Sequence, residues 1–248
     1  MRIATATREA QKFERQVHVN GHDYTLREYV GAMPLHGKYV DGNESNDNGM
    51  PQGFLVYQPP GSITPPHFHE TNQFQVFVDG DGKMGKRAAG PLTVQYANGH
   101  TPYGPIEAGE KGVRYFTLRQ YWDPGAKYMP QSKGKLRKGN QRTRQKGNIP
   151  VGAQSTQSGV SKEVVFPLES DGLTAEIYRV GAGSQFEVPI ENNCGGQYLV
   201  VASGEVVIDN GPFDRWSTIF VTPDEGTSEF TAGPEAVSYT HLTLPTSG

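Results

Sequence analysis

The sequence contains a single cysteine, Cys194, so no disulfide bond can form within the chain. One cysteine also excludes the cysteine-rich type of zinc site. No apolar run approaches the roughly 18 residues of a membrane-spanning helix, and residues 1–16 lack the apolar core of a signal peptide. We therefore expect a cytoplasmic protein that has no association with a membrane.

The chain also lacks a large excess of charge of either sign. Its 23 Lys and Arg residues stand against 26 Asp and Glu residues, which gives a formal net charge of −3 at pH 7. Such a balance produces no overall field that would attract the phosphates of a nucleic acid. We therefore expect no nucleic-acid partner.

Long stretches with helical periodicity are missing as well. Instead, 31 Gly and 18 Pro make up about a fifth of the chain, against about 12% in an average protein. Pairs such as Asp79-Gly80 and Asn98-Gly99 indicate tight turns between short segments of strand-like composition. This pattern predicts an all-β chain of antiparallel sandwiches or barrels. We expect strands at residues 25–29, 53–58, 73–78, 92–96, 113–121, 163–167, 174–180, 197–201, 205–208 and 218–221.

An internal repeat divides these segments into two sets. Residues 61–80 read GSITPPHFHETNQFQVFVDG, and residues 183–204 read GSQFEVPIENNCGGQYLVVASG. Both begin with Gly-Ser, and both contain a glutamine, Gln73 or Gln197, followed after six residues by the closing glycine. We infer that the chain contains two copies of one β-domain.

Charge and composition predict where these copies begin and end. Residues 130–161 contain seven basic and no acidic residues, which predicts a solvated linker. An arm that binds anions is the alternative for this segment. The predicted organisation is an N-terminal arm at 1–24, a first barrel at 25–129, the basic linker at 130–161, a degenerate and truncated second barrel at 162–236, and a tail at 237–248.

The tail differs in origin from the rest of the chain, on our interpretation. Residues 237–246 read VSYTHLTLPT, which resembles a translated sequencing adapter of the kind found in metagenomic sequences. We therefore expect the natural chain to stop near Ala236, and the tail takes no part in the functional prediction. The alternative is a natural C-terminal strand, since the segment alternates with a period of two.

His67 and His69 form the most informative pair in the sequence. They are two residues apart, so alternation along a strand places both rings on one face, and the two preceding prolines favour extended backbone. Two imidazoles on one face supply two ligands to a metal ion. Gln73 and Gln75 share a face of the next predicted strand, as expected of a strand that lines a polar cavity.

This spacing resembles the first motif of the cupin superfamily, in which Gly is followed by His-X-His, then Glu and a second Gly at fixed intervals. Gly61, His67, His69 and Gly80 match the motif, whereas Gln73 stands where the family has its glutamate. An amide is a neutral and weaker metal ligand than a carboxylate. The departure from the motif leaves open whether Gln73 is a ligand or a neighbouring hydrogen-bond donor.

The resemblance covers most of residues 25–122 and, as a copy without its histidines, about 163–236. It implies two double-stranded β-helix (jelly-roll) barrels, a bicupin, with a metal site in the N-terminal barrel only. The second cupin motif is degraded, and alignment places either His100 or Tyr103 at its histidine. We favour His100, because a neutral imidazole binds divalent metals better than a phenol near neutral pH.

The cupin resemblance implies a dioxygenase-type oxidoreductase that acts on a small, oxygen-bearing substrate chelated at a divalent metal ion. Fe(II) is the first choice, with Mn, Ni, Zn or Cu as alternatives. Tyr103 at the cavity mouth and Gln75 are the candidate catalytic residues, which would orient the substrate. The predicted metal ligands are His67, His69, Gln73 and His100.

Other functions remain open on the sequence alone. One is a non-catalytic cupin that binds a small metabolite, and another is a redox-neutral lyase or isomerase that uses the metal as a Lewis acid. The site itself could also hold a metal without catalysis or have lost its metal. A homodimer is an expectation from the resemblance alone.

Overall fold

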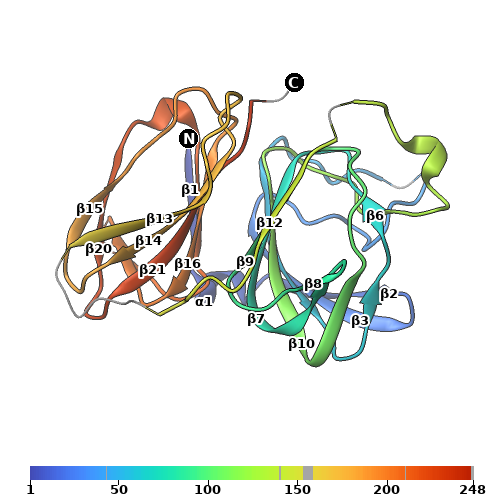
Figure 1. The fold of residues 1–248 in the computed structure, drawn as a ribbon, viewed down its shortest axis with the longest axis horizontal. Helices are drawn as coiled ribbons and strands as arrows, with labels where there is room; N and C mark the ends of the chain where they lie inside the picture. Colours follow the sequence, from blue (N-terminus) through green and yellow to red (C-terminus); the bar gives the residue numbers. More distant parts are fainter. Residues whose placement is uncertain (43, 140, 153–158, 210, 247–248) are drawn as a thin grey trace. The chain divides into compact units, whose positions relative to one another are not determined.

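The computed structural model of the 248-residue chain describes residues 1–42, 44–139, 141–152, 159–209 and 211–246 (Figure 1). The chain folds as two compact units. We call residues 13–149 the N-terminal unit and residues 1–12 together with 150–248 the C-terminal unit. Each unit has its own sheets and its own apolar core.

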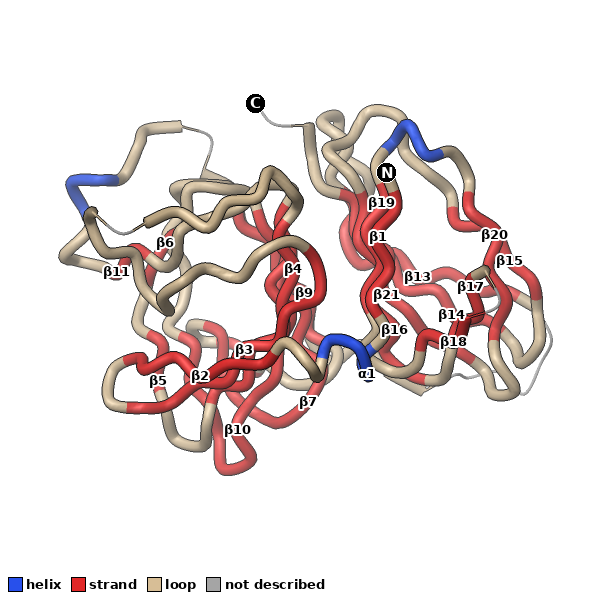
Figure 2. The backbone as a smooth tube through the Cα atoms, turned by 180° about the vertical axis from the view of Figure 1, so that it is seen from behind, coloured by secondary structure: helices blue, strands red, loops and turns tan. Residues whose placement is uncertain are grey.

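The N-terminal unit is built almost wholly from antiparallel strands. They are β2 (Glu14–Val19), β3 (His22–Val30), β4 (Gln52–Gln58), β5 (Ile63–Thr64), β6 (His67–Phe68), β7 (Gln73–Met84), β8 (Arg87–Ala88), β9 (Thr93–Ala97), β10 (Ile106–Arg119), β11 (Lys127–Tyr128) and β12 (Thr143–Lys146), with one 3-10 turn, η1 (Lys133–Lys135). The main sheet has the order β12-β9-β7-β10-β4-β3-β2, and β5 and β8 pair with β10 and β7. Strands β6 and β11 form a separate small sheet, which lies across the unit from β7 and β9 (Figures 1 and 2).

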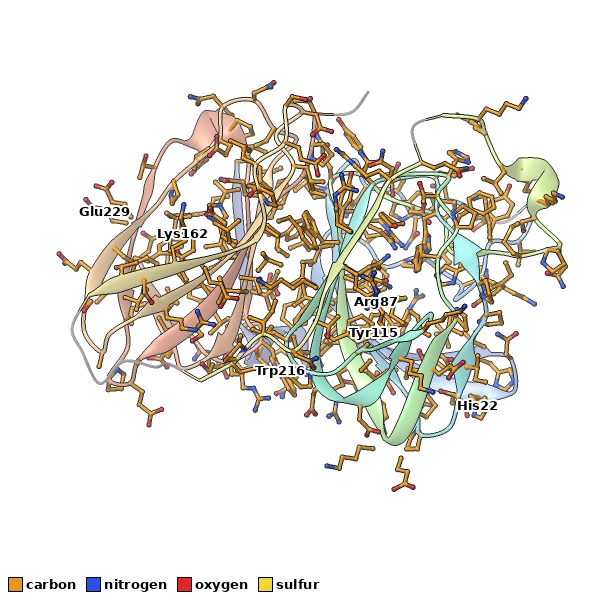
Figure 3. All side chains as sticks on the ribbon, viewed as in Figure 1. His22, Arg87, Tyr115, Lys162, Trp216 and Glu229 are labelled. Atoms are coloured by element: carbon orange, nitrogen blue, oxygen red, sulfur yellow. The ribbon has the colours of Figure 1, made fainter. Side chains whose placement is uncertain are left out.

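Alternating side chains from β7 and β10 fill the interior of this unit. Phe77 and Tyr115 are paired across the two strands, and their ring centroids lie 5.1 Å apart. Tyr115 is 4% exposed, whereas His22 and Arg87, also labelled in Figure 3, lie at the surface. The apolar side chains of the alternating pattern therefore point into the unit, as burial of apolar surface requires.

The C-terminal unit consists of a second set of strands. They are β1 (Arg2–Thr5), β13 (Val160–Phe166), β14 (Thr174–Val180), β15 (Gln185–Val188), β16 (Gln197–Ser203), β17 (Val206–Ile208), β18 (Gly211–Phe213), β19 (Thr218–Val221), β20 (Ser228–Ala232) and β21 (Val237–Thr243), with the short helix α1 (Thr7–Ala10) and the 3-10 turn η2 (Pro223–Glu225). One sheet has the order β1-β19-β16-β21-β14-β13 and the other β15-β20-β17-β18. Lys162 and Glu229 mark the outer surface of this unit (Figure 3).

The two large sheets repeat one strand order. Strands β9-β7-β10-β4-β3 of the N-terminal unit occupy the same places, in the same chain order, as β19-β16-β21-β14-β13 of the C-terminal unit. The edge next to β9 is occupied by β12 and the edge next to β19 by β1, which come from the end of one unit and the start of the other. The motif glycines also correspond: Gly80 and Gly204 have φ of +80° and +74°, and a Cβ on either would lie within 2.5 Å of the oxygen of Gly112 or Ala236. Only glycine tolerates both the positive φ and the lack of space for a Cβ atom. The prediction of an all-β fold with two jelly-roll barrels is confirmed.

The structure divides the chain at other places than the predicted boundaries. Residues 2–5 form β1 on the edge of the C-terminal unit, whereas residues 14–19 form β2 of the N-terminal unit, so residues 1–24 do not act as one arm. Within the predicted linker, residues 143–146 form the edge strand β12, paired with β9. An edge strand exposes one side to water and tolerates basic residues, so its composition resembles that of a linker. Positions 140 and 153–158 of that linker lie outside the described residues.

The segment that resembles an adapter is a central strand of this chain. Strand β21 pairs with both β14 and β16, and all of its residues are buried. It takes the place that the second half of β10 holds in the N-terminal unit. The origin of residues 237–246 stays a prediction, and residues 247 and 248 of the tail lie outside the described residues. Among the residues that the structure describes, no helix has the length and apolar character that a bilayer crossing needs.

Candidate metal centre

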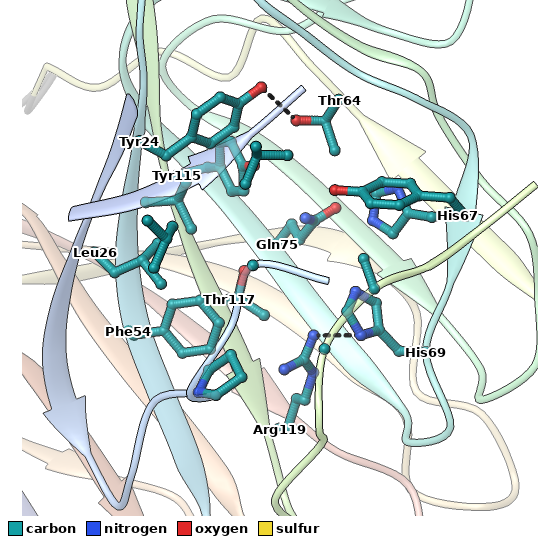
Figure 4. Close-up of a pocket in the computed structure, with 18 residues that line it drawn as sticks. Tyr24, Leu26, Phe54, Thr64, His67, His69, Gln75, Tyr115, Thr117 and Arg119 are labelled. Atoms are coloured by element: carbon teal, nitrogen blue, oxygen red, sulfur yellow. Dashed lines mark hydrogen bonds between the residues drawn. The ribbon is translucent and has the colours of Figure 1, made fainter. Parts of the chain in front are cut away.

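A cavity of about 70 Å³ lies inside the N-terminal unit, between the small sheet and the main sheet (Figure 4). Both predicted histidines, His67 and His69, line it, as does Gln75 of β7. The side chains that complete the lining include the polar Thr64, Thr117 and Arg119 and the apolar Leu26, Phe54 and Val56. A small molecule could therefore meet polar groups on one side and apolar surface on the other.

The ring of His67 has one nitrogen in a fixed hydrogen bond and one available to a ligand. Its Nδ1 lies 2.8 Å from the carbonyl oxygen of Pro65. A carbonyl oxygen can only accept, so we assign the ring proton to Nδ1. The lone pair then lies on Nε2, which is 2.9 Å from the hydroxyl oxygen of Tyr103. Burial, and then the neighbouring His69, lower the pKa of His67 to about 3, so the ring is neutral at pH 7.

His69 is oriented in the same way by a buried carboxylate. Its Nδ1 lies 2.7 Å from Oδ1 of Asp123, and the Arg119 guanidinium lies 3.0 Å from the same nitrogen (Figure 4). The carboxylate only accepts, and it is the nearer of the two groups, so we assign the ring proton to Nδ1, where it is donated to Asp123. The Arg119 nitrogen then lies beside Nδ1 without a hydrogen bond to it, and the lone pair is on Nε2. Burial, and next the charge of Arg119, lower the pKa of His69. Both imidazoles are therefore neutral, with the lone pair of each ring on Nε2.

Asp123 is completely buried and fully used as an acceptor. Oδ1 accepts from His69 and from the backbone N–H of Gly125, and Oδ2 accepts from the backbone N–H of Glu70 at 2.8 Å. Burial by itself raises the pKa of this carboxyl, but His69, Arg119 and these hydrogen bonds together bring the pKa below its ordinary value. Asp123 is thus a charged group that holds the imidazole in place.

Tyr103 reaches the histidines from the loop between β9 and β10. Its backbone N–H and C=O exchange hydrogen bonds with the backbone of His67 at 2.9 and 3.0 Å, which fixes the loop against β6. The two ring centroids lie 4.5 Å apart. The Tyr103 hydroxyl oxygen also accepts a hydrogen bond from Nε2 of Gln73. Burial raises the pKa of this phenol well above its ordinary value.

Gln73 is held so that its amide nitrogen faces Tyr103. Its Oε1 accepts two hydrogen bonds from Arg119, from Nε at 3.0 Å and from Nη2 at 2.8 Å. Arginine has only donors, so rotation of the Gln73 amide by half a turn would break both of these hydrogen bonds. The guanidinium also donates to Gln52 and is 1% exposed. Gln73 therefore offers an N–H to the site, and its oxygen is not available to a metal ion.

His100 does not join the other two histidines. Its ring packs on Phe68, with centroids 5.5 Å apart, and its Nδ1 faces the backbone N–H of Arg137. Phe68 lies between His67 and His69 in an extended segment, so its side chain points away from the face that carries the two imidazoles. His100 does not line the cavity. It has φ of +56° and donates its backbone N–H to His69 O, a turn geometry that directs the ring outward.

Gln75 lines the cavity opposite the imidazoles (Figure 4). The residue is 3% exposed, and its Oε1 has no hydrogen-bond partner among the described residues. An unpaired buried carbonyl oxygen costs free energy unless a ligand or water pairs with it. Gln75 is therefore placed to accept a hydrogen bond from a bound molecule.

Two residues of this site, Asp123 and Arg119, carry little functional signal in the sequence. Asp123 opens the tripeptide Asp-Pro-Gly, which is typical of an exposed turn, although the structure buries it completely. Arg119 lines the cavity, whereas Arg114 of the same strand pairs with Asp79. The described residues contain no group of three or more His, Cys, Asp or Glu that could hold a metal ion. A metal site here must use other donor types beside the two imidazoles.

The donor atoms that are present fit a metal ion. Two ligands about 2.1 Å from one ion and at right angles to each other stand about 3 Å apart, and the distance from His67 Nε2 to the Tyr103 oxygen is 2.9 Å. Two imidazoles on one ion have ring centroids about 5 Å apart, and the centroids of His67 and His69 are 5.2 Å apart. Both distances agree with one ion held by these side chains.

No protein-family model matches this sequence, and no curated protein does. Solved structures are nevertheless similar in fold. A protein of Nostoc punctiforme PCC 73102, named only as a candidate dioxygenase, superimposes with a TM-score of 0.68 at 10% identity over 99% of this chain and 83% of its own. The bacterial pirin YhhW of Escherichia coli, in complex with nickel(II), has a TM-score of 0.55 at 13% identity over the whole of both chains. Quercetin 2,3-dioxygenase of Acinetobacter baumannii has a TM-score of 0.53 at 12% identity over 95% of this chain and 80% of its own. These likenesses show that the chain has the cupin fold.

Proposed function

We propose that this chain is a metal-dependent cupin enzyme of the dioxygenase type, which acts on a small, oxygen-bearing organic molecule. The observation that carries the proposal is the histidine pair. The Nδ1 atoms of His67 and His69 are bound to Pro65 O and Asp123 Oδ1, so both Nε2 atoms carry a lone pair that could hold one ion, which at His67 would replace the hydrogen bond from the Tyr103 hydroxyl. A divalent ion with redox chemistry, with Fe(II) as the first choice, would activate the substrate there.

The rest of the cavity supports a small substrate with oxygen atoms. Gln75 accepts a hydrogen bond from it, and the positive charge of Arg119 favours an oxygen-rich or anionic group. The apolar wall formed by Leu26 and Phe54 excludes water from the other side. Two of the solved structures with this fold are named as dioxygenases and a third contains nickel(II), which supports a metal-dependent dioxygenase chemistry for this chain.

Metal analysis of the purified protein tests the site directly. We expect about one equivalent of Fe(II) after reconstitution under argon, and its loss in the His67→Ala, His69→Ala double variant. The matched control is His18→Ala, His22→Ala, which removes two exposed histidines of the same unit. Unchanged metal content in the first variant would contradict the proposal.

Oxygen uptake tests the reaction class. The Fe(II)-loaded protein is offered catechol, pyruvate and oxalate, and oxygen consumption is followed together with product formation. A dioxygenase consumes oxygen in proportion to product and stops under argon. Equal turnover under argon would instead assign a lyase or isomerase, and binding without turnover would assign a metabolite-binding protein.

A further inference from the structure

We propose that Tyr103, as a phenolate, is the third protein ligand of the metal, and that Gln73 positions it by donating a hydrogen bond to its oxygen. This inference rests on the proposed metal site of His67 and His69. It supplies the ligand that the histidine pair lacks. On binding, the ion takes the place of the phenol proton, which is released to water.

The first argument is the position of the phenol oxygen. It lies 2.9 Å from Nε2 of His67, which is the separation of two neighbouring ligands on one ion. Tyr103 is 8% exposed, and its hydroxyl meets Nε2 of His67 and Nε2 of Gln73. The reciprocal backbone hydrogen bonds between Tyr103 and His67 hold the two side chains in this register. From the sequence we predicted that Tyr103 lies at the cavity mouth and orients the substrate. The contacts with His67 and Gln73 favour a role as a metal ligand instead.

The second argument is the orientation of Gln73. Arg119 fixes Oε1 with two hydrogen bonds, so Nε2 faces the oxygen of Tyr103. A donor aimed at a phenol oxygen stabilises the form in which that oxygen carries negative charge. Gln73 therefore acts on the metal through Tyr103, as a positioning residue.

The third argument is charge. Two neutral imidazoles leave a divalent ion with its full charge in a buried site, and a buried charge without compensation is costly. The carboxylate of Asp123 is already paired with His69. A phenolate at Tyr103 supplies one negative charge directly at the ion, which the neutral amide of Gln73 cannot do.

Spectroscopy of the metal-loaded protein tests the ligand without any assay of activity. Phenolate bound to Cu(II) or Fe(III) gives a charge-transfer band in the visible region, and Raman excitation in that band enhances phenolate ring vibrations. We expect the band in the wild-type protein with one equivalent of Cu(II). We expect no band in Tyr103→Phe, which should bind Cu(II) about tenfold more weakly or worse.

Tyr128→Phe is the matched control, because Tyr128 also lines the cavity and its ring centroid lies 5.7 Å from that of His67. The band should persist in this variant. Tyr103→His controls for a folding defect in Tyr103→Phe, because histidine can bind a metal but has no phenolate. This variant should bind Cu(II) and lack the band. In Gln73→Leu the band should move to lower energy, since the phenolate loses the donor that stabilises it.

The outcomes separate this inference from the proposed function. If Cu(II) binding depends on His67 and His69 but the wild-type protein has no band, or if the band persists in Tyr103→Phe, the tyrosine is not a ligand and the metal site stands. If Cu(II) binding does not depend on the two histidines, the proposed function fails together with the inference.

Discussion

His69 and Asp123 are 54 residues apart in the sequence, and their side chains meet in a buried hydrogen bond of 2.7 Å. This contact sets which nitrogen of the imidazole carries the proton, and so which nitrogen can bind a metal. A carboxylate behind a metal-binding histidine also raises the basicity of the ligand. The relationship can therefore be tested through metal affinity.

We expect Asp123→Asn to weaken Fe(II) binding about 10- to 100-fold. The asparagine oxygen can still accept from His69, but the neutral side chain no longer stabilises the imidazole, and its amide nitrogen faces the backbone N–H of Glu70. Competition with a chelator of known affinity under argon measures the change. Asp79→Asn, which removes a half-exposed partner of Arg114, is the control and should leave the affinity as it is. Equal affinities in both variants would show that Asp123 does not support a ligand.

A second prediction concerns the Gln73–Arg119 contact and the free energy of unfolding. Gln73→Leu removes the acceptor of two hydrogen bonds from a buried guanidinium, so we expect a loss of about 3 kcal/mol. Gln95→Leu is the control, because Gln95 is also buried and its Oε1 has no partner among the described residues. Its loss should stay below about 1 kcal/mol, since no hydrogen bond of that oxygen is broken.

Urea unfolding in a Trp216→Phe background reports the N-terminal unit, because Trp122 is then the only tryptophan. Losses of the same size in the two glutamine variants would mean that Arg119 does not depend on Gln73 for its hydrogen bonds.

A third prediction concerns the motif glycines. Gly80 and Gly61 both have positive φ, +80° and +69°, but only at Gly80 would a Cβ meet the backbone, 2.0 Å from Gly112 O. We expect Gly61→Ala to cost about 1 kcal/mol for the left-handed backbone alone. Gly80→Ala should cost at least about 3 kcal/mol, because β7 and β10 must also separate. The same urea measurement compares the two, and a smaller loss at Gly80 would contradict the close approach of the strands.

A fourth prediction gives the pH dependence of the C-terminal unit. His241 is buried in β21, its Nε2 donates to Gln197 Oε1 at 2.8 Å, and burial lowers its pKa to about 4. Because the folded pKa lies below the unfolded value of about 6.5, protonation favours the unfolded state. The stability is complete above pH 6.5 and falls as the pH drops toward 4, by about 2 kcal/mol at pH 5.

The comparison of wild type with His241→Gln isolates this contribution. Urea unfolding at pH 7 and pH 5 in a Trp122→Phe background follows the C-terminal unit through Trp216. The variant should lose about 2 kcal/mol less between the two pH values than the wild type does. The exposed His22→Gln serves as control and should follow the wild type. Equal pH dependence of wild type and His241→Gln would mean that the ring is not buried as a neutral group.

The sequence determined by itself those features that depend on local patterns. Period-two alternation and frequent turn residues specify strands, so the all-β fold could be predicted. The repeat around Gln73 and Gln197 predicted two similar units, and the two sheets share one strand order. The spacing of His67 and His69 placed both rings in one cavity for the same reason, since side chains two apart share a face of an extended chain.

Only the tertiary structure decided which other residues reach those rings. The loop that contains His100 and Tyr103 has no periodicity, so the sequence could not set its register, and the preference for His100 rested on ligand chemistry alone. The backbone pairing of Tyr103 with His67 brings the phenol to the site and leaves His100 outside it. Asp123 likewise looks like a surface turn until the fold buries it beside His69. These contacts join segments that are 36 and 54 residues apart, and such pairings depend on how strands meet in space rather than on any local pattern.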